Sequence, residues 1–320
     1  MSLRAAAVEA YKSSDLISWR STGKLQQTIA GYIEKTGATL HSGNRSTVRI
    51  WPEAAGTGRY FDFCSRLIPA SIDFAQDSPL CTTLRKDGYS LRTVEHLLSA
   101  LEGTGVDNCR IEIVSSDHDA TSAEVPIFDG SSLEWVEAIE KVGLTVAVDC
   151  NGRSRDKLAP YITQPVYVSK GDSVIAAFPS KEANVSYGID FLQVPSLGLQ
   201  WFSLVFGSGT NSIYSKQIAP SRTFCIYEEV EKMRNAGLIK GGSEDNALVF
   251  STSKGLLNPP LRSPEEPCSH KILDFIGDVS LFARSGSQGL PVANIIAYKA
   301  CHQGRSHAAC RICSPTVRNS

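Results

Sequence analysis

The sequence lacks three features that would assign the chain to a specialised class of protein. Its apolar runs are all far shorter than the roughly 20 residues that a membrane-spanning helix needs. Its formal net charge is only −1 and it has no arginine-rich stripe, so we do not expect it to bind nucleic acid. Its nine cysteines, scattered from Cys64 to Cys313, are too sparse for a secreted disulfide scaffold. We expect most of them to be reduced, small, buried residues.

The remaining composition is that of a globular chain. Hydrophobic residues make up 42% of the 320 residues and charged residues 20%, which is enough to bury a core. This length suits two ordinary domains or one large domain.

The first two dozen residues differ from the rest. They contain several serines, no long apolar run and four basic residues, which are Arg4, Lys12, Arg20 and Lys24. The missing apolar run excludes a secretory signal, and the basic residues favour an organellar presequence. Glu9 and Asp15 count against a presequence, so an unstructured terminus over residues 1–23 is the alternative.

A polar, glycine-containing stretch at residues 149–157 (DCNGRSRDK) divides the chain into two halves. We expect a first domain over residues 24–150, a linker over 151–164 and a second domain over 165–320. Each half begins with strand-like segments and ends with a helix, without strict alternation of strand and helix. This order predicts an α+β fold instead of a doubly wound sheet, and the halves could be two copies of one unit.

Apolar patterns predict the individual elements. Strands are expected at residues 47–50, 109–113, 166–168, 174–178, 185–189, 201–206 and 293–298. Helices are expected at residues 94–101, 133–142, 223–234 and 269–282.

Polar residues on the last of these helices are candidates for chemistry. His270 and Asp274 are four residues apart, so they lie on one helix face about a turn apart, and Asp278 continues this stripe. A histidine and a carboxylate at this spacing can bind one zinc ion. The alternative is a solvated pair on an exposed face, which is the commoner reason for such short motifs.

Two further signals point to the same chemistry. Glu95 and His96 lie within the apolar run of the first helix, where His96 could bind a metal and Glu95 could take a proton from water. A stabilising acid in the first helical turn is the alternative for Glu95. His302 follows a predicted strand and could act as an acid toward a leaving amine. Three protein ligands would leave one position open for water, as in catalytic zinc sites.

Longer motifs together resemble one known family. They are LHSG at residues 40–43, TVEHLLSALEGTGVDN at 93–108, EVPIFDGSS at 124–132, SRTF at 221–224, GLIKGGS at 237–243 and HKILDFIGD at 270–278. In this order they resemble the UDP-3-O-acyl-N-acetylglucosamine deacetylases of lipid A biosynthesis, a likeness that runs from Leu25 to His302. The sequence of these motifs, including SPLCTTL at 78–84, is most similar to that of the plant members, which are mitochondrial.

The resemblance implies a fold and a catalytic set. The implied fold has two α+β domains, each a sheet packed on two helices, with the helices sandwiched between the sheets. The implied zinc ligands are His96, His270 and Asp274. Glu95 matches the general base of the family, and His302 matches its general acid or electrostatic stabiliser. Asp278 matches the carboxylate that orients His302.

The resemblance also implies residues that contact the substrate. Lys271 and Lys299 match lysines near the oxyanion or the phosphates of the substrate. Thr223 matches a hydroxyl near the zinc, and Phe224 matches an aromatic residue near the uridine end. The helix after Phe224 corresponds to an insert that forms a passage for the acyl chain.

The implied activity is zinc-dependent hydrolysis of the N-acetyl group of UDP-3-O-(3-hydroxyacyl)-N-acetylglucosamine, an early committed step of lipid A biosynthesis. Fe²⁺ could occupy the same ligands. Cys301 stands where the family has glycine, and the tail over residues 303–320 lacks the family's terminal helix. A catalytically impaired homologue that still binds zinc and nucleotide-sugar lipid is therefore the alternative. We expect a monomer in mitochondria, with the cytoplasm as the other location.

Overall fold

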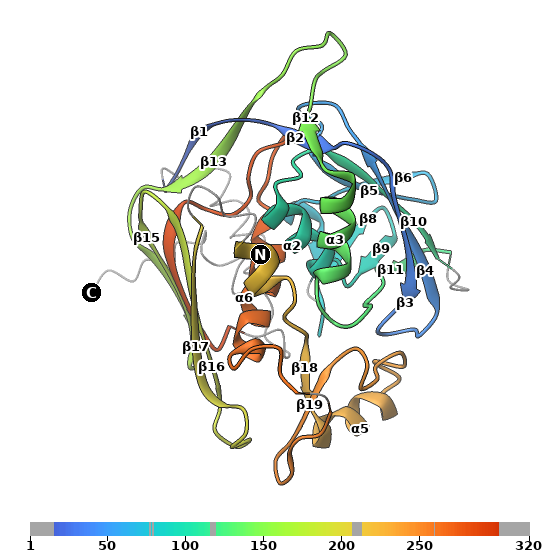
Figure 1. Ribbon diagram of the computed structural model, residues 1–320, viewed down its shortest axis with the longest axis vertical. Coiled ribbons are helices and arrows are strands. Elements are labelled where there is room, and N and C mark those ends of the chain that lie inside the picture. Colours follow the sequence, from blue (N-terminus) through green and yellow to red (C-terminus); the bar gives the residue numbers. More distant parts are fainter. Residues whose placement is uncertain are drawn as a thin grey trace.

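The computed structural model describes residues 16–76, 78, 80–115, 120–206, 213–258 and 260–300. Within these residues the chain is built on two five-stranded sheets with helices between them, as Figure 1 shows. The α+β class predicted from the sequence is therefore confirmed. The division into two domains stays a prediction.

The two five-stranded sheets share one topology. The first sheet has the order β3 (Ile33–Ala38), β4 (Arg45–Pro52), β10 (Cys109–Ser115), β5 (Arg59–Phe63) and β6 (Arg66–Pro69). The second has the order β14 (Val166–Lys170), β15 (Ser173–Pro179), β21 (Ala293–Tyr298), β16 (Ala183–Phe191) and β17 (Gly198–Phe206). In each, the strand that comes last in the chain lies between two hairpins, antiparallel to the first and parallel to the second. The two halves thus repeat the same arrangement of strands.

Smaller sheets complete the β-structure. One pairs β1 (Ile17–Leu25) with β13 (Asp156–Ile162), and another pairs β2 (Gln27–Ile29) with β12 (Leu144–Val146). A four-stranded sheet contains β7 (Ala75–Gln76), β8 (Thr83–Lys86), β9 (Tyr89–Arg92) and β11 (Ser122–Glu124). A three-stranded sheet contains β18 (Phe224–Ile226), β19 (Leu248–Ser251) and β20 (Gly255–Leu256).

The β1–β13 pair corrects two boundaries expected from the sequence. Residues 17–23 lie in β1, so the unstructured terminus expected over residues 1–23 is wrong for this part, whereas the presequence stays a prediction. Residues 156–162 were expected to be part of a linker, yet they form β13. The two segments bond to each other, with Ile17 opposite Ile162. A pairing between residues so far apart in the chain leaves no local pattern in either segment.

Four α-helices and two short turns lie within the described residues. The helices are α2 (Glu95–Thr104), α3 (Leu133–Val142), α5 (Tyr227–Asn235) and α6 (Glu266–Ser280). The turns are the 3₁₀ turn η1 (Ile72–Phe74) and the π-helical turn η2 (Tyr214–Ile218). The helices predicted at 94–101, 133–142 and 269–282 are confirmed. The helix predicted from residue 223 is wrong at its start, because 224–226 form β18, which pairs in parallel with β19.

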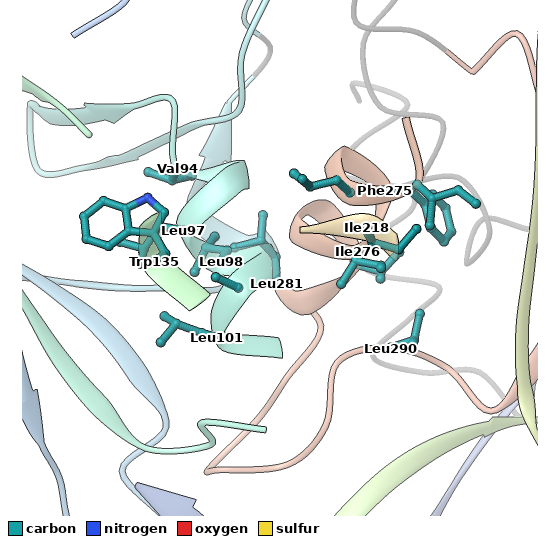
Figure 2. Close-up of a cluster of buried hydrophobic side chains, with 14 of the residues drawn as sticks. Val94, Leu97, Leu98, Leu101, Trp135, Ile218, Phe275, Ile276, Leu281 and Leu290 are labelled. Carbon is teal, nitrogen blue, oxygen red and sulfur yellow. The ribbon is translucent and has the colours of Figure 1, made fainter. Parts of the chain in front are cut away.

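The core lies where α2 meets α6. Leu97, Leu98 and Leu101 form the predicted apolar face of α2, and all three are fully buried. Phe275 and Ile276 of α6 belong to the same cluster, part of which Figure 2 shows. Burying each such side chain contributes about 1.5–3 kcal/mol. Packing of this interface, more than helix propensity, therefore fixes the position of α2 against α6.

A glycine allows the two helices to approach closely. A Cβ atom at Gly277 of α6 would lie 2.2 Å from the carbonyl oxygen of Glu95, the first residue of α2. Glycine is the residue without that atom. The start of α2 therefore lies directly against the last turns of α6, beside the polar residues singled out above.

Candidate metal centre

Three buried side chains meet at this contact between α2 and α6. His96 is the second residue of α2, and His270 and Asp274 lie on successive turns of α6. The Oδ1 atom of Asp274 is 3.5 Å from Nε2 of His96 and 3.3 Å from Nε2 of His270. The three residues are at most 6% exposed. The solvated pair considered for His270 and Asp274 is therefore wrong, because α6 is covered on this face.

The separations fit ligands that share one ion. All three ligand atoms lie within 4.8 Å of one another. Two ligands each about 2.0–2.1 Å from a tetrahedral ion are about 3.3–3.4 Å apart. The two nitrogen–oxygen distances are close to that value and are long for hydrogen bonds. Two imidazoles and one carboxylate are a suitable ligand set for zinc and for iron(II).

His270 is held in the form that binds a metal. Its Nδ1 atom lies 2.9 Å from the carbonyl oxygen of Ser221, an acceptor, so Nδ1 is the nitrogen that carries the proton. The lone pair is then on Nε2, which faces Asp274. Burial lowers the pKa of His270 to about 3, and the nearby Asp274 offsets only part of this effect. The imidazole is therefore neutral at physiological pH.

Glu95 lies beside the three ligands as a buried carboxyl. Its Oε2 atom accepts a hydrogen bond of 2.9 Å from the backbone N–H of Thr82. Burial raises the pKa of Glu95 well above its ordinary value, and the neighbouring Asp274 and Asp278 raise it further. A nearby cation would favour the carboxylate form. The role of Glu95 as a proton acceptor stays a prediction.

Thr82 connects Glu95 to Asp278. While its N–H binds Glu95, its hydroxyl donates a hydrogen bond of 2.5 Å to Oδ1 of Asp278. Thr82 lies within the SPLCTTL stretch, but nothing in the sequence gave it a role, because a threonine just before a short strand is an ordinary residue. Its position depends on the segment just before β8 reaching both α2 and α6.

Of the residues matched to the substrate, Lys271, Thr223 and Phe224 line one cavity and Lys299 does not. Lys271 donates a hydrogen bond of 2.9 Å to Oδ2 of Asp274 and lies 5.4 Å above the ring of Phe224. Thr223 and Phe224 line the same cavity as the metal ligands. Lys299 is not among the residues that line this cavity, and it pairs with Asp172 and Asp190. Its predicted role at the substrate stays a prediction.

The predicted general acid lies outside the described residues, as does Cys301. The role of His302, and that of Asp278 in orienting it, therefore stay predictions. Within the described structure, Asp278 binds Thr82.

The cavity extends from the ligands into an apolar passage. Its volume is about 220 Å³, and one end is formed by Glu95, His96, His270 and Asp274. The other end runs between β18, β19 and α5. Apolar side chains line much of this end, together with the charged Glu229 and Arg234 of α5; among the apolar ones are Ile226, Val230, Met233, Ile239 and Val249. The arrangement suits a molecule with a polar reacting group and a long apolar chain.

A buried carboxylate joins three of the motifs quoted above. Glu124 accepts hydrogen bonds from the backbone N–H and Nδ1 of His41 and from the hydroxyl of Thr93. Thr93 has a φ of 57°, which is costly for a β-branched residue, and it lies two residues before Glu95. Backbone bonds from Lys240 to His41 and from Gly241 to Leu40 then attach the segment before β19 to the same loop. Glu124 thus holds two segments in place: the residues just before α2, and the loop at residues 40–41 that contacts the segment before β19.

Comparison with known proteins shows to which family the chain is related. The model of a family described as UDP-3-O-acyl N-acetylglycosamine deacetylase matches residues 26–314. The chain belongs to this family. It is 58% identical over 290 residues to a probable UDP-3-O-acyl-N-acetylglucosamine deacetylase 1, mitochondrial, of Arabidopsis thaliana, covering 91% of this chain and 88% of the relative.

Bacterial relatives extend the likeness. The chain is 44% identical over 292 residues to the UDP-3-O-acyl-N-acetylglucosamine deacetylase of Trichormus variabilis (strain ATCC 29413 / PCC 7937), covering 90% of this chain and 98% of the relative. The corresponding protein of Synechocystis sp. (strain ATCC 27184 / PCC 6803 / Kazusa) is 40% identical over 289 residues, with coverage of 89% and 97%. The resemblance drawn from the motifs is thereby confirmed. The family match also spans the position of His302.

Proposed function

We propose that this chain removes the N-acetyl group of UDP-3-O-(3-hydroxyacyl)-N-acetylglucosamine by hydrolysis, giving the free amine and acetate, as an early committed step of lipid A biosynthesis. One observation carries the proposal in a chain of this family. The three buried ligand candidates, with Glu95 beside them, form the polar end of a cavity whose other end is an apolar passage.

His96, His270 and Asp274 would hold the metal ion, which we propose to be zinc, with iron(II) as the alternative. Such an ion supplies Lewis-acid polarisation of the amide carbonyl and activation of a water molecule. The chain contributes the neutral imidazole of His270, fixed by the Ser221 carbonyl. It also excludes bulk water from the ligands, since all three are buried.

Proton transfer is assigned to two residues. Glu95 accepts the proton of the attacking water, because it is the carboxylate beside the ligands and Thr82 holds it in place. His302, assigned from the family resemblance, donates a proton to the leaving amine. Asp278, which lies one turn of α6 beyond Asp274, is the carboxylate assigned to orient His302.

The remaining residues bind and orient the substrate. Thr223 and Lys271 line the cavity next to the ligands, where a hydroxyl and an ammonium group can stabilise the developing oxyanion. Phe224 presents an aromatic face, packed edge-on against Phe191 and Phe250. The passage between β18 and α5 would bury the acyl chain, which gives about 0.8 kcal/mol for each buried methylene group.

We further propose that the protein acts as a monomer in mitochondria, on the basis of the plant relatives whose names include that location. Within the described residues, no helix has the length and apolarity needed to cross a bilayer.

A comparison of two substrates tests the proposed function. The purified chain is incubated with UDP-3-O-(3-hydroxymyristoyl)-N-acetylglucosamine and with UDP-N-acetylglucosamine, which lacks the acyl chain, and both products are analysed by mass spectrometry. We expect deacetylation of the acylated sugar and little reaction of the other. His302→Ala should lower the rate by about 10²–10⁴-fold if it is the general acid. Absence of any deacetylation by a zinc-loaded chain would favour the impaired homologue.

A further inference from the structure

A buried ion pair lies one helical turn before the metal ligand His270. Glu266 is the first residue of α6 and is fully buried, and Arg222 is 8% exposed. Nε of Arg222 is 2.8 Å from Oε1 of Glu266, and its Nη2 is 3.1 Å from Oε2. Arg262 adds a backbone N–H bond of 2.6 Å to the same carboxylate. A buried pair of this kind is weak evidence of stabilisation, since its desolvation offsets much of its attraction.

The pair is connected to the metal centre through a single peptide group. The backbone N–H of Arg222 donates a hydrogen bond of 3.0 Å to Oε1 of Glu266. The carbonyl of Ser221, which belongs to the same peptide group, accepts the hydrogen bond of 2.9 Å from Nδ1 of His270. Because the peptide is planar, its N–H and C=O cannot turn independently. Glu266 and His270, four residues apart on one face of α6, therefore hold this group from both ends.

We propose that Glu266 is a positioning residue for the metal centre and that it acts on His270 through the Ser221–Arg222 peptide group. The carboxylate polarises the amide by accepting its N–H, so the carbonyl becomes a stronger acceptor for the imidazole. A stronger bond at Nδ1 fixes the ring and increases the basicity of Nε2, the atom that faces the metal site. The arrangement is a carboxylate–histidine–metal triad with a peptide group inserted between carboxylate and histidine.

The side chain of Arg222 has a different part in this arrangement. It neutralises Glu266 and also donates a hydrogen bond of 2.9 Å to the carbonyl of Pro260. These contacts attach the loop before α6, but they are not in the path to His270, which runs through the backbone of Arg222. Changing the arginine side chain should therefore affect the stability of the protein more than its metal affinity.

Two variants separate positioning from a merely structural role. Glu266→Gln keeps the size and shape of the side chain but removes its charge. Its amide NH₂ would face the N–H groups of Arg222 and Arg262, which are themselves donors. Arg222→Lys keeps a positive charge and the backbone N–H that binds Glu266. Three quantities are measured: the zinc dissociation constant by competition with a chromophoric chelator, the thermal unfolding of the metal-free chains, and the NMR shift of the His270 Nδ1 proton in the zinc-loaded chains.

We expect Glu266→Gln to raise the zinc Kd by about tenfold, the lower end of the range for groups that bind a ligand directly. The Nδ1 proton of His270 should move upfield. Arg222→Lys should lower the unfolding temperature of the metal-free chain and leave the zinc Kd within about twofold. An unchanged Kd in Glu266→Gln, or an equal rise in both variants, would overturn the proposal.

Two complications, misfolding of Glu266→Gln and failure of the unaltered chain to bind zinc, each have their own control. If Glu266→Gln does not fold, Glu266→Asp replaces it. This variant keeps the charge but withdraws the carboxylate from the Arg222 N–H, so the same rise in the zinc Kd is expected. An unchanged Kd in Glu266→Asp overturns the proposal. The inference rests on the proposed metal centre, so zinc binding by the unaltered chain is measured first. Failure of that binding would overturn both, whereas an unchanged Kd in the variants overturns only the role of Glu266.

Discussion

Gly277 of α6 lies so close to Glu95 of α2 that a Cβ at position 277 would be 2.2 Å from the Glu95 carbonyl oxygen. This contact brings His96, which follows Glu95, within reach of His270 and Asp274. The candidate metal centre is thus assembled by the packing of two helices.

Gly277→Ala should separate the two helices. The added methyl group meets backbone that cannot move aside, so we expect a loss of about 1–3 kcal/mol in the free energy of unfolding. Zinc affinity should fall in the same variant. Denaturant unfolding of the metal-free chain and zinc competition measure the two effects. Gly31→Ala is the matched control, because a Cβ there meets only Val142 at an ordinary 3.7 Å. Equal stability of the two variants would contradict this account of the contact.

Glu95→Gln should strongly slow catalysis without removing the metal. The amide retains the size of the side chain but cannot accept a proton, so kcat should fall by about 10²–10⁴-fold. Zinc content, measured by elemental analysis, should stay at the level of the unaltered chain. Asp274→Asn serves as the contrasting variant, since it removes a ligand and should lose both zinc and activity. Loss of zinc in Glu95→Gln to the same extent would mean that Glu95 is itself a ligand.

Val230→Trp should narrow the apolar passage. Val230 lines the cavity on α5, and a larger side chain there would obstruct a long acyl chain more than a short one. We expect kcat/KM to fall for the hydroxymyristoyl substrate and to change little for a substrate with a short acyl group. Lys232→Trp, at an exposed position outside the cavity lining, is the control. An equal fall in kcat/KM for the long and the short acyl substrate would mean that the acyl chain binds outside this passage.

Glu124 should stabilise the fold in a way that depends on pH. Burial raises its pKa, but the hydrogen bonds and charge of His41 and the hydroxyl of Thr93 outweigh this, so its net pKa is lowered. Stability from a carboxyl with a lowered pKa is present above the pKa of the unfolded state, about 4.3. It is lost as pH falls through the folded value.

The variant Glu124→Gln tests this dependence. At pH 7 it should unfold with a free energy about 1–3 kcal/mol below that of the unaltered chain, because it leaves buried donors poorly paired. The difference should shrink as pH falls below about 4. Denaturant titrations over this range measure it. A difference that stays constant with pH would show that the charge of Glu124 contributes nothing.

The sequence predicted the elements with strong local patterns. The apolar spacing of Leu97, Leu98 and Leu101 predicted α2, and the spacing of His270 and Asp274 placed both on one face of α6. From the residues alone His96 was one weak candidate to join them, and the family resemblance gave the specific assignment, since the contact through Gly277 is a property of two helices far apart in the chain.

Other features depend on partners that no local pattern shows. Residues 224–226 were predicted to be helical because the residues that follow them have a helical pattern. Their pairing with β19 makes them a strand instead. Ser221 binds His270 through its backbone carbonyl, and Thr82 binds Glu95 through its backbone N–H. Every residue possesses these atoms, so the sequence carries no signal of these two contacts. Glu266 and Arg222 are charged residues that would ordinarily be assigned to the surface.

The most direct test of the central claim is acetate release by metal-free chain titrated with zinc. The purified protein is stripped with a chelator, and hydrolysis of UDP-3-O-(3-hydroxymyristoyl)-N-acetylglucosamine is followed as zinc is returned. We predict no acetate without metal and activity that rises with zinc until one ion is bound per chain, with His96→Ala inactive throughout. Acetate release by the stripped chain at the rate of the zinc-loaded one would contradict the account.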